Sequence, residues 1–197
     1  MDIDFRSPDV VHLSRQLLGY RLCTSIDGQL TSGIIVETEA YRAPEDKASH
    51  AYNGRRTSRT ETIFCEGGVS YVYLCYGIHC LFNVVSGPSD TAHAILVRAL
   101  QPESGIELMK RRRGPSIRDR DLTSGPGKLC QALGITRQLN GLELGKEAGT
   151  GIWLEPGIEI STEDITEAKR IGVDYAEEWK EKLWRFYMKG NPFVSVI

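Results

Sequence analysis

The 197-residue sequence contains no hydrophobic run long enough to cross a bilayer. Its longest apolar tract, 71–85, is interrupted by Gly77, His79 and Asn83 and falls short of the roughly 20 residues that a membrane-spanning helix needs. The first five residues include two aspartates, and no apolar segment follows them, whereas secretory and transit peptides need positive charge. We therefore expect a soluble, cytoplasmic protein without a membrane partner.

An excess of charge of either sign is also lacking, because 24 Lys and Arg residues face 26 Asp and Glu residues. Together with a hydrophobic fraction of 41%, this balance excludes disordered and collagen-like chains and proteins with a basic tail. The five cysteines form no CxxC pair, so without an export signal we expect reduced, mostly buried thiols. At roughly 150 residues per domain, we expect a single domain over 1–197.

Strand and helix signals are interleaved irregularly along the chain. Runs of β-prone residues predict strands at 20–24, 30–41, 69–74 and 92–100, the first two joined by a hairpin signal at Asp27-Gly28. Capping and stop signals predict a helix that begins at Ser7-Pro8-Asp9, with Ser7 as N-cap, and further helices at 103–112, 128–133 and 162–171. This order favours a mixed α/β (α+β) fold over a regular βαβ repeat.

Two glutamates in the second predicted strand are unusual for a core strand. Glu37 and Glu39 lie two positions apart, so their side chains share one face, about 7 Å apart along the strand, with Ile35 and Tyr41. Burying a carboxylate beside the apolar run 34–36 is costly unless a cation or hydrogen-bond donors compensate. A carboxylate held in this way suits general-base or nucleophile chemistry. Alternatively, the strand leaves the sheet here and ends in water.

Aromatic and basic residues form a second pattern. Tyr71 and Tyr73 share a face if the strand continues, and Tyr76 precedes a turn at Gly77. Such rings usually belong to a core, but they also serve as stacking platforms for bases and, at a turn, as a wedge into the base stack. Basic clusters lie at Arg55, Arg56 and Arg59 and at 110–113 with Arg118 and Arg120. These clusters are either solvated loops and helix ends or a phosphate-binding surface.

Motifs for metal ions and nucleotides are incomplete. Cys75, His79 and Cys80 lack a second ligand pair at suitable spacing, so we expect no metal ion. The run 124–129 departs from the phosphate-loop pattern, because leucine stands at both positions where glycine and a hydroxyl residue are needed. Its glycines and Lys128 can still offer donors to an anion such as a DNA phosphate, with a tight turn as the alternative.

Several segments carry a recognisable combination in order along the chain. They are 35–41 (Ile-Val-Glu-Thr-Glu-Ala-Tyr), 44–46 with His50, 71–77 with Asn83, 96–100 (Leu-Val-Arg-Ala-Leu), 125–129 and 185–192. Each segment alone is a weak signal, but the ordered set extends over nearly the whole chain, which makes chance a poor explanation. The chain resembles the alkyladenine (3-methyladenine) DNA glycosylase family.

The resemblance implies a single compact domain with a curved, mainly antiparallel sheet flanked by helices. It also implies a monomeric enzyme that works without a cofactor or metal. Such an enzyme flips a damaged purine (alkylated, deaminated or etheno-adducted) out of double-stranded DNA and hydrolyses the N-glycosidic bond, leaving an abasic site. An alkylated purine carries positive charge, which weakens that bond and favours contact with aromatic faces.

The resemblance also assigns roles to individual residues. Glu39, the second glutamate of the Glu-Thr-Glu-Ala-Tyr motif, matches the residue that deprotonates the attacking water, and Arg98 matches the arginine that helps to hold this water and the carboxylate. Other positions match the base pocket (Tyr41, His50, Tyr73), the side chain inserted into DNA (Tyr76) and the residue that disfavours normal guanine (Asn83). Candidate phosphate contacts are Arg55, Arg56, Arg59 and Lys128.

Two other functions stay open on the residues alone. A noncatalytic nucleic-acid-binding module would use the aromatic strand and basic loops, but it has no need of a buried strand carboxylate. A carbohydrate glycosidase could use Glu37 and Glu39 as its carboxylate pair, although both come from one strand rather than from opposite walls of a cleft. Simple alternation does not distinguish the two glutamates; only the family pattern favours Glu39.

Overall fold

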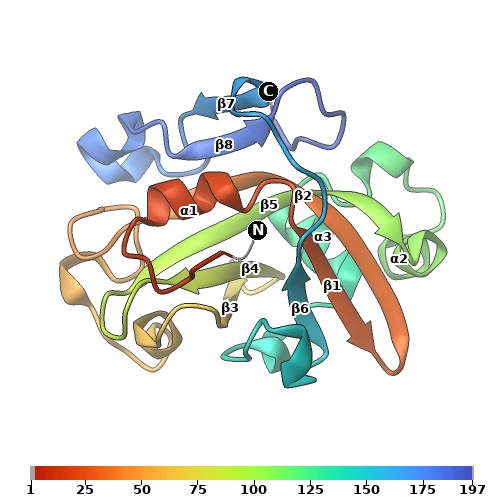
Figure 1. Cartoon of the computed structure of the whole chain (residues 1–197), viewed down its shortest axis with the longest axis horizontal. Helices are drawn as coiled ribbons and strands as arrows, with labels where there is room; N and C mark the ends of the chain where they lie inside the picture. The colour runs from red at the N-terminus through yellow and green to blue at the C-terminus, as the bar shows by residue number, and fades with distance from the viewer. Residues whose placement is uncertain (1–2, 197) are drawn as a thin grey trace.

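The computed structural model describes residues 3–196, in which eight strands form one sheet and every strand pair is antiparallel (Figure 1). The sheet order is β3-β4-β5-β2-β1-β6, and β8 pairs with both β2 and β7. The strands are β1 (Arg21–Ile26), β2 (Gln29–Tyr41), β3 (Ser70–Cys75), β4 (His79–Ser86), β5 (His93–Ser104), β6 (Ile152–Glu155), β7 (Ile165–Ala168) and β8 (Arg185–Met188). The α-helices are α1 (Val10–Gln16), α2 (Ile106–Arg113) and α3 (Pro126–Leu133).

The expected fold class is confirmed: the chain is a mixed α/β domain with a curled antiparallel sheet. Figure 1 shows β7 and β8 beside α1 at one end of the molecule and β1 and β6 toward the other, with β5 running across the middle. The main core includes fully buried side chains of all three helices and of β1, β2 and β5, among them Leu13, Leu22, Ile35, Ile95, Leu100, Met109 and Leu129. Within residues 3–196 no helix is long and apolar enough to cross a membrane.

Strand β2 is the central strand, because it has three partners. Its first half pairs with β1, its residues 37–39 pair with β8, and β5 runs along its other edge. Residues 37–39 therefore lie between two strands, and the alternative in which the strand leaves the sheet for water is wrong. The expected hairpin between β1 and β2 is confirmed, and its turn has only two residues, Asp27 (φ 52°) and Gly28 (φ 72°).

Several expected boundaries need correction. Asp9, rather than Ser7, is the N-cap of α1, since its carboxylate accepts a hydrogen bond from the His12 amide at 3.0 Å. α2 begins at Ile106 because β5 continues to Ser104 before Gly105 turns the chain at φ 74°. β4 was not recognised as a strand in the sequence.

The expected helix at 162–171 is wrong. The segment forms a short 3₁₀ turn (Thr162–Asp164) and then β7, whose four residues pair with β8. The local capping and stop signals favour a helix only weakly. The backbone hydrogen bonds between β7 and β8 outweigh them. Thiol burial was also overestimated: Cys23 and Cys130 are buried, whereas Cys65 is exposed and Cys75 and Cys80 are half-buried.

Candidate active site

Two fully buried carboxylates flank one arginine in the middle of the sheet. The side chains of Glu37 and Glu39 are 0% exposed, and Arg98 on β5 lies between them. Arg98 Nε lies 3.2 Å from Glu37 Oε1, and its Nη1 lies 3.2 Å from Glu39 Oε2. Register shifts on either side of Glu37 leave Arg98 outside the regular pairing, so its side chain can reach both carboxylates. Burial alone would lower the pKa of Arg98, but the charges of Glu39 and Glu37 raise it overall.

Glu39 accepts from three different parts of the chain. Besides Arg98, the Tyr41 hydroxyl donates to Glu39 Oε2 at 2.8 Å, and the Ile171 amide donates to Oε1 at 2.7 Å. An ionised carboxylate has about four acceptor positions. Three are used, which leaves one position for a further donor such as water.

Glu37 is held differently, although it shares the strand and the burial of Glu39. Arg185 Nη1 donates to its Oε1 at 2.9 Å, and the Ser195 amide donates to its Oε2 at 2.7 Å. Arg185 also donates to the carbonyl of Val196 at 2.8 Å. Glu37 therefore anchors the segment that follows β8, and the two glutamates have different surroundings.

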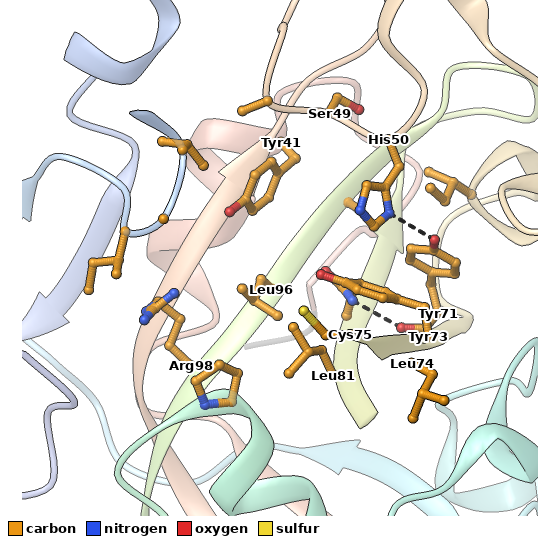
Figure 2. Close-up of a pocket in the computed structure, with 18 of the residues that line it drawn as sticks. Tyr41, Ser49, His50, Tyr71, Tyr73, Leu74, Cys75, Leu81, Leu96 and Arg98 are labelled. Carbon is orange, nitrogen blue, oxygen red and sulfur yellow. Dashed lines mark hydrogen bonds between the residues drawn. The ribbon is translucent and has the colours of Figure 1, made fainter. Parts of the chain in front are cut away.

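A cavity of about 590 Å³ lies next to this cluster, within the usual size range of small-molecule sites. Among the described residues, neither glutamate borders the cavity, but Tyr41, Arg98 and Ile171, the three partners of Glu39, all do. Figure 2 shows Arg98 and Tyr41 on one side of the cavity and the aromatic residues His50, Tyr71 and Tyr73 on the other.

The aromatic wall is held by contacts among its own members. His50 Nδ1 and the Tyr71 hydroxyl are 3.0 Å apart, and the His50 and Tyr73 rings meet edge to face with centroids 4.6 Å apart. The amide nitrogen of Asn83 donates to the Tyr71 carbonyl at 3.1 Å. Burial lowers the pKa of His50 to about 4, and the positive charges of Arg59 and Arg55 add to this shift. Burial raises the pKa of Tyr71 to about 12, so both side chains are uncharged at neutral pH.

Tyr76 lies at the tip of the β3–β4 hairpin, on the rim of the cavity. Its side chain is 94% exposed, which excludes a core role. Its φ is 49°, a left-handed conformation that is an outlier for a bulky residue, and Gly77 follows at φ 72°. The neighbouring Ile78 is 73% exposed, so the tip presents an apolar pair to solvent.

The model of the methylpurine-DNA glycosylase family matches residues 4–192. A protein of Chlamydia pneumoniae that carries the name 3-methyladenine DNA glycosylase is 49% identical over 200 residues, covering 98% of this chain and 96% of its own. A protein of the same name from Natranaerobius thermophilus is 44% identical over 100% of this chain and 98% of its own. A protein of Encephalitozoon cuniculi that carries the name DNA-3-methyladenine glycosylase is 47% identical over 94% of this chain and 88% of its own.

The chain belongs to the methylpurine-DNA glycosylase family. It is therefore a DNA glycosylase, a hydrolase of N-glycosidic bonds, and the reading as a noncatalytic binding module is set aside. The structure also argues against a carbohydrate glycosidase that uses both glutamates, because Arg185 and Ser195, two of the three partners of Glu37, do not border the cavity, whereas all three partners of Glu39 do.

The four candidate phosphate contacts of the glycosylase differ in their exposure and in their ion-pair partners. Arg59 borders the cavity, with its guanidinium 5.3 Å from the Tyr73 ring centre, and Lys128 lies half-exposed in α3, 3.9 Å from Asp121. Arg55 is exposed, whereas Arg56 is already engaged by Glu61 and Asp90, each at 2.6 Å.

The second basic cluster is mostly structural. Arg112 donates to the carbonyl of Ala132, Arg113 donates to the carbonyl of Leu122, and Lys110 pairs with Asp119. These contacts hold α2 against α3 and the segment between them, so most of this cluster is not a free phosphate-binding surface.

The sequence did not identify three features of this glycosylase site. Ile171 contributes only a backbone amide, which no residue pattern marks. Arg170 and Asp46 form a fully buried ion pair behind Tyr41 and come from segments 124 residues apart. Tyr71, which the alternation with Tyr73 already offered as a stacking ring, was not assigned to the base pocket.

Proposed function

We propose that this glycosylase removes alkylated purines from double-stranded DNA, and also accepts deaminated or etheno-adducted purines. It flips the nucleotide into the aromatic cavity and hydrolyses the N-glycosidic bond with a water activated by Glu39. One observation carries the proposal. A buried carboxylate, paired with Arg98 and with one acceptor position left, lies directly behind a cavity of about 590 Å³ that has aromatic walls.

Extrusion is required because a base inside the duplex cannot reach a buried carboxylate. Unstacking costs a few kcal/mol and is least unfavourable for a damaged or mispaired base. The exposed Tyr76 ring on the rim of the cavity can enter the gap in the stack, and Tyr41, His50 and Tyr73 can stack on the flipped base. Both contacts offset part of the cost.

Selection among purines follows from the lining of the cavity. A positively charged alkylated purine is attracted by aromatic faces, and an uncharged His50 adds no repulsion. Asn83 borders the cavity and its amide donates to the Tyr71 carbonyl; by resemblance to the family it is the residue that disfavours the exocyclic amine of guanine.

In the chemical step, the bond between C1′ and the purine nitrogen breaks and the base leaves with the electron pair. The water oxygen bonds to C1′, and Glu39 receives the proton that the water loses. Positive charge develops on the sugar as the bond breaks, and an ionised Glu39 stabilises it. Arg98 holds the carboxylate and the water. No lysine adduct forms, and the product is an abasic site.

DNA binding uses Arg59 at the cavity, the exposed Arg55 and the half-exposed Lys128, with Arg56 contributing once it exchanges a carboxylate for a phosphate. The enzyme acts as a monomer on double-stranded DNA.

The test is a panel of duplex oligonucleotides that each carry one alkylated, deaminated or etheno-adducted purine, assayed for free base with and without chelator. We expect base release from at least the alkylated duplexes in both conditions, with no adduct trapped by borohydride. Binding without base release, or release that requires added zinc, would overturn the proposal.

A further inference from the structure

Arg170 and Asp46 form an ion pair whose two side chains are both 0% exposed. The pair is bidentate: Arg170 Nη1 lies 2.5 Å from Asp46 Oδ2, and Nη2 lies 2.8 Å from Oδ1. The guanidinium also donates to the carbonyl of Ala40 at 2.9 Å and to that of Trp179 at 3.2 Å. A buried pair with this many partners holds its cation in one position.

The guanidinium lies against the ring of Tyr41. Its central carbon is 4.7 Å from the Tyr41 ring centre, within the range of a cation–π contact, and 5.2 Å from the ring of Trp184. Tyr41 borders the cavity whereas Arg170 does not. The cation therefore covers the face of Tyr41 that is turned away from the cavity.

The same pair connects other parts of the site. Asp46 accepts from the amides of Ala48 at 3.0 Å and Arg42 at 3.3 Å, so it shapes the loop that carries His50. The residue after Arg170 is Ile171, whose amide donates to Glu39. The charge of Arg170 also acts on the Tyr41 hydroxyl: burial and then Glu39 raise the pKa of Tyr41, and Arg170 opposes this rise.

We propose that Arg170 is a specificity-determining positioning residue that acts through Tyr41 to limit the preference of the pocket for cationic over neutral purines. An aromatic ring attracts a cation through the negative charge of its faces. A fixed cation on the far face draws that charge away and repels a cationic base on the near face, while a neutral base feels little difference. The inference rests on the proposed function, since it requires purines to enter this cavity.

The experiment compares single-turnover base release from two duplexes, one with cationic 7-methylguanine and one with neutral hypoxanthine. The measured quantity is the ratio of the two rates. In Arg170→Met combined with Asp46→Asn, the charge pair is removed while the loop amides keep an acceptor. We expect the ratio to rise about threefold or more. Arg170→Lys, which keeps the charge, should hold the ratio closer to the unmodified protein than the double variant does.

The matched control is Arg15→Met. Arg15 also lies over a ring, 4.9 Å from the centre of Phe186, and pairs with Glu167, but it does not border the cavity. The ratio of the two base-release rates should not change in this variant. A purely structural role of Arg170 would lower both rates together and leave the ratio unchanged.

Asp46→Asn alone gives the opposite test, because Arg170 then keeps its charge without the neutralising carboxylate. We expect the ratio to fall, and this variant decides the question where the double variant does not fold. An unchanged ratio in a folded variant of the pair overturns the inference. Failure of the unmodified protein to release either base would instead overturn the proposed function.

Discussion

The Tyr41 hydroxyl donates a hydrogen bond of 2.8 Å to Oε2 of Glu39, so one side chain contributes both to the wall of the cavity and to the carboxylate behind it. Burial, reinforced by the charge of Glu39, raises the pKa of Tyr41 well above its ordinary value. The hydroxyl therefore remains protonated and keeps donating across the physiological range.

Tyr41→Phe should slow base release about tenfold while lesion binding changes little. The substitution keeps the stacking ring and removes one hydrogen bond to a charged group, which contributes about 1.5–3 kcal/mol. Single-turnover rates and binding isotherms on one lesion duplex measure the two effects. Tyr187→Phe in β8 is the control, because its hydroxyl makes no hydrogen bond to Glu39 within residues 3–196. Equal losses in both variants would contradict the role given to the Tyr41 hydroxyl.

Glu39→Gln should abolish base release and leave lesion binding largely intact, because it removes the proton acceptor and keeps the shape. Glu37→Gln should instead lower the free energy of unfolding by about 3–5 kcal/mol, since it leaves buried Arg185 and Arg98 short of a counter-charge. Chemical denaturation and single-turnover cleavage separate the two effects. If cleavage survives Glu39→Gln and collapses in folded Glu37→Gln, the roles are reversed.

Tyr76→Ala should weaken lesion affinity by a few kcal/mol at most, because the lost stacking no longer offsets unstacking. Its effect on unfolding should stay within about 0.5 kcal/mol, as expected for a fully exposed residue. The loss of affinity should be smaller on a mispaired lesion, where less stacking and pairing must be broken. Binding and base release on paired and mispaired versions of one lesion test this point. An equal loss on both duplexes would remove the wedge role.

His50 should titrate near pH 4 in the folded protein, against 6.5 ordinarily. Its contribution to stability is complete above pH 6.5 and is lost as the pH falls toward 4, because the unfolded chain then binds a proton that the folded protein does not. NMR titration of the imidazole gives the value directly. In Arg59→Gln the pKa should rise only part of the way, since burial is the largest cause. A titration near 6.5 in the unmodified protein would contradict the buried, uncharged state.

The local part of the site follows from the sequence. Strand alternation places Glu37, Glu39 and Tyr41 on one face, because that geometry depends only on neighbouring residues. The structure adds what distinguishes the two glutamates, and those partners are distant: Arg185 and Ser195 lie 148 and 158 positions from Glu37. No local pattern encodes such contacts.

The errors in the predicted secondary structure also arise from contacts between residues that are distant in the sequence. Residues 162–171 carry good helix signals, yet β7 forms there because β8 offers its backbone groups. The register shifts that free Arg98 depend on how β2 and β5 align, which alternation alone does not determine. Strand alternation does not indicate that Arg98 lies beside the two glutamates. The resemblance to the family singled out Arg98 from the sequence alone.

The long separation between Glu39 and its amide donor, 132 positions, has a consequence for how the protein is made. On the ribosome, β2 emerges long before the residues from 170 to 196 that donate to its two carboxylates. Until that segment arrives, Glu37 lacks Arg185 and the Ser195 amide, and Glu39 lacks the Ile171 amide, so both carboxylates favour water over the sheet interior more than they do in the finished protein. The surroundings of the two glutamates are therefore completed only late in synthesis.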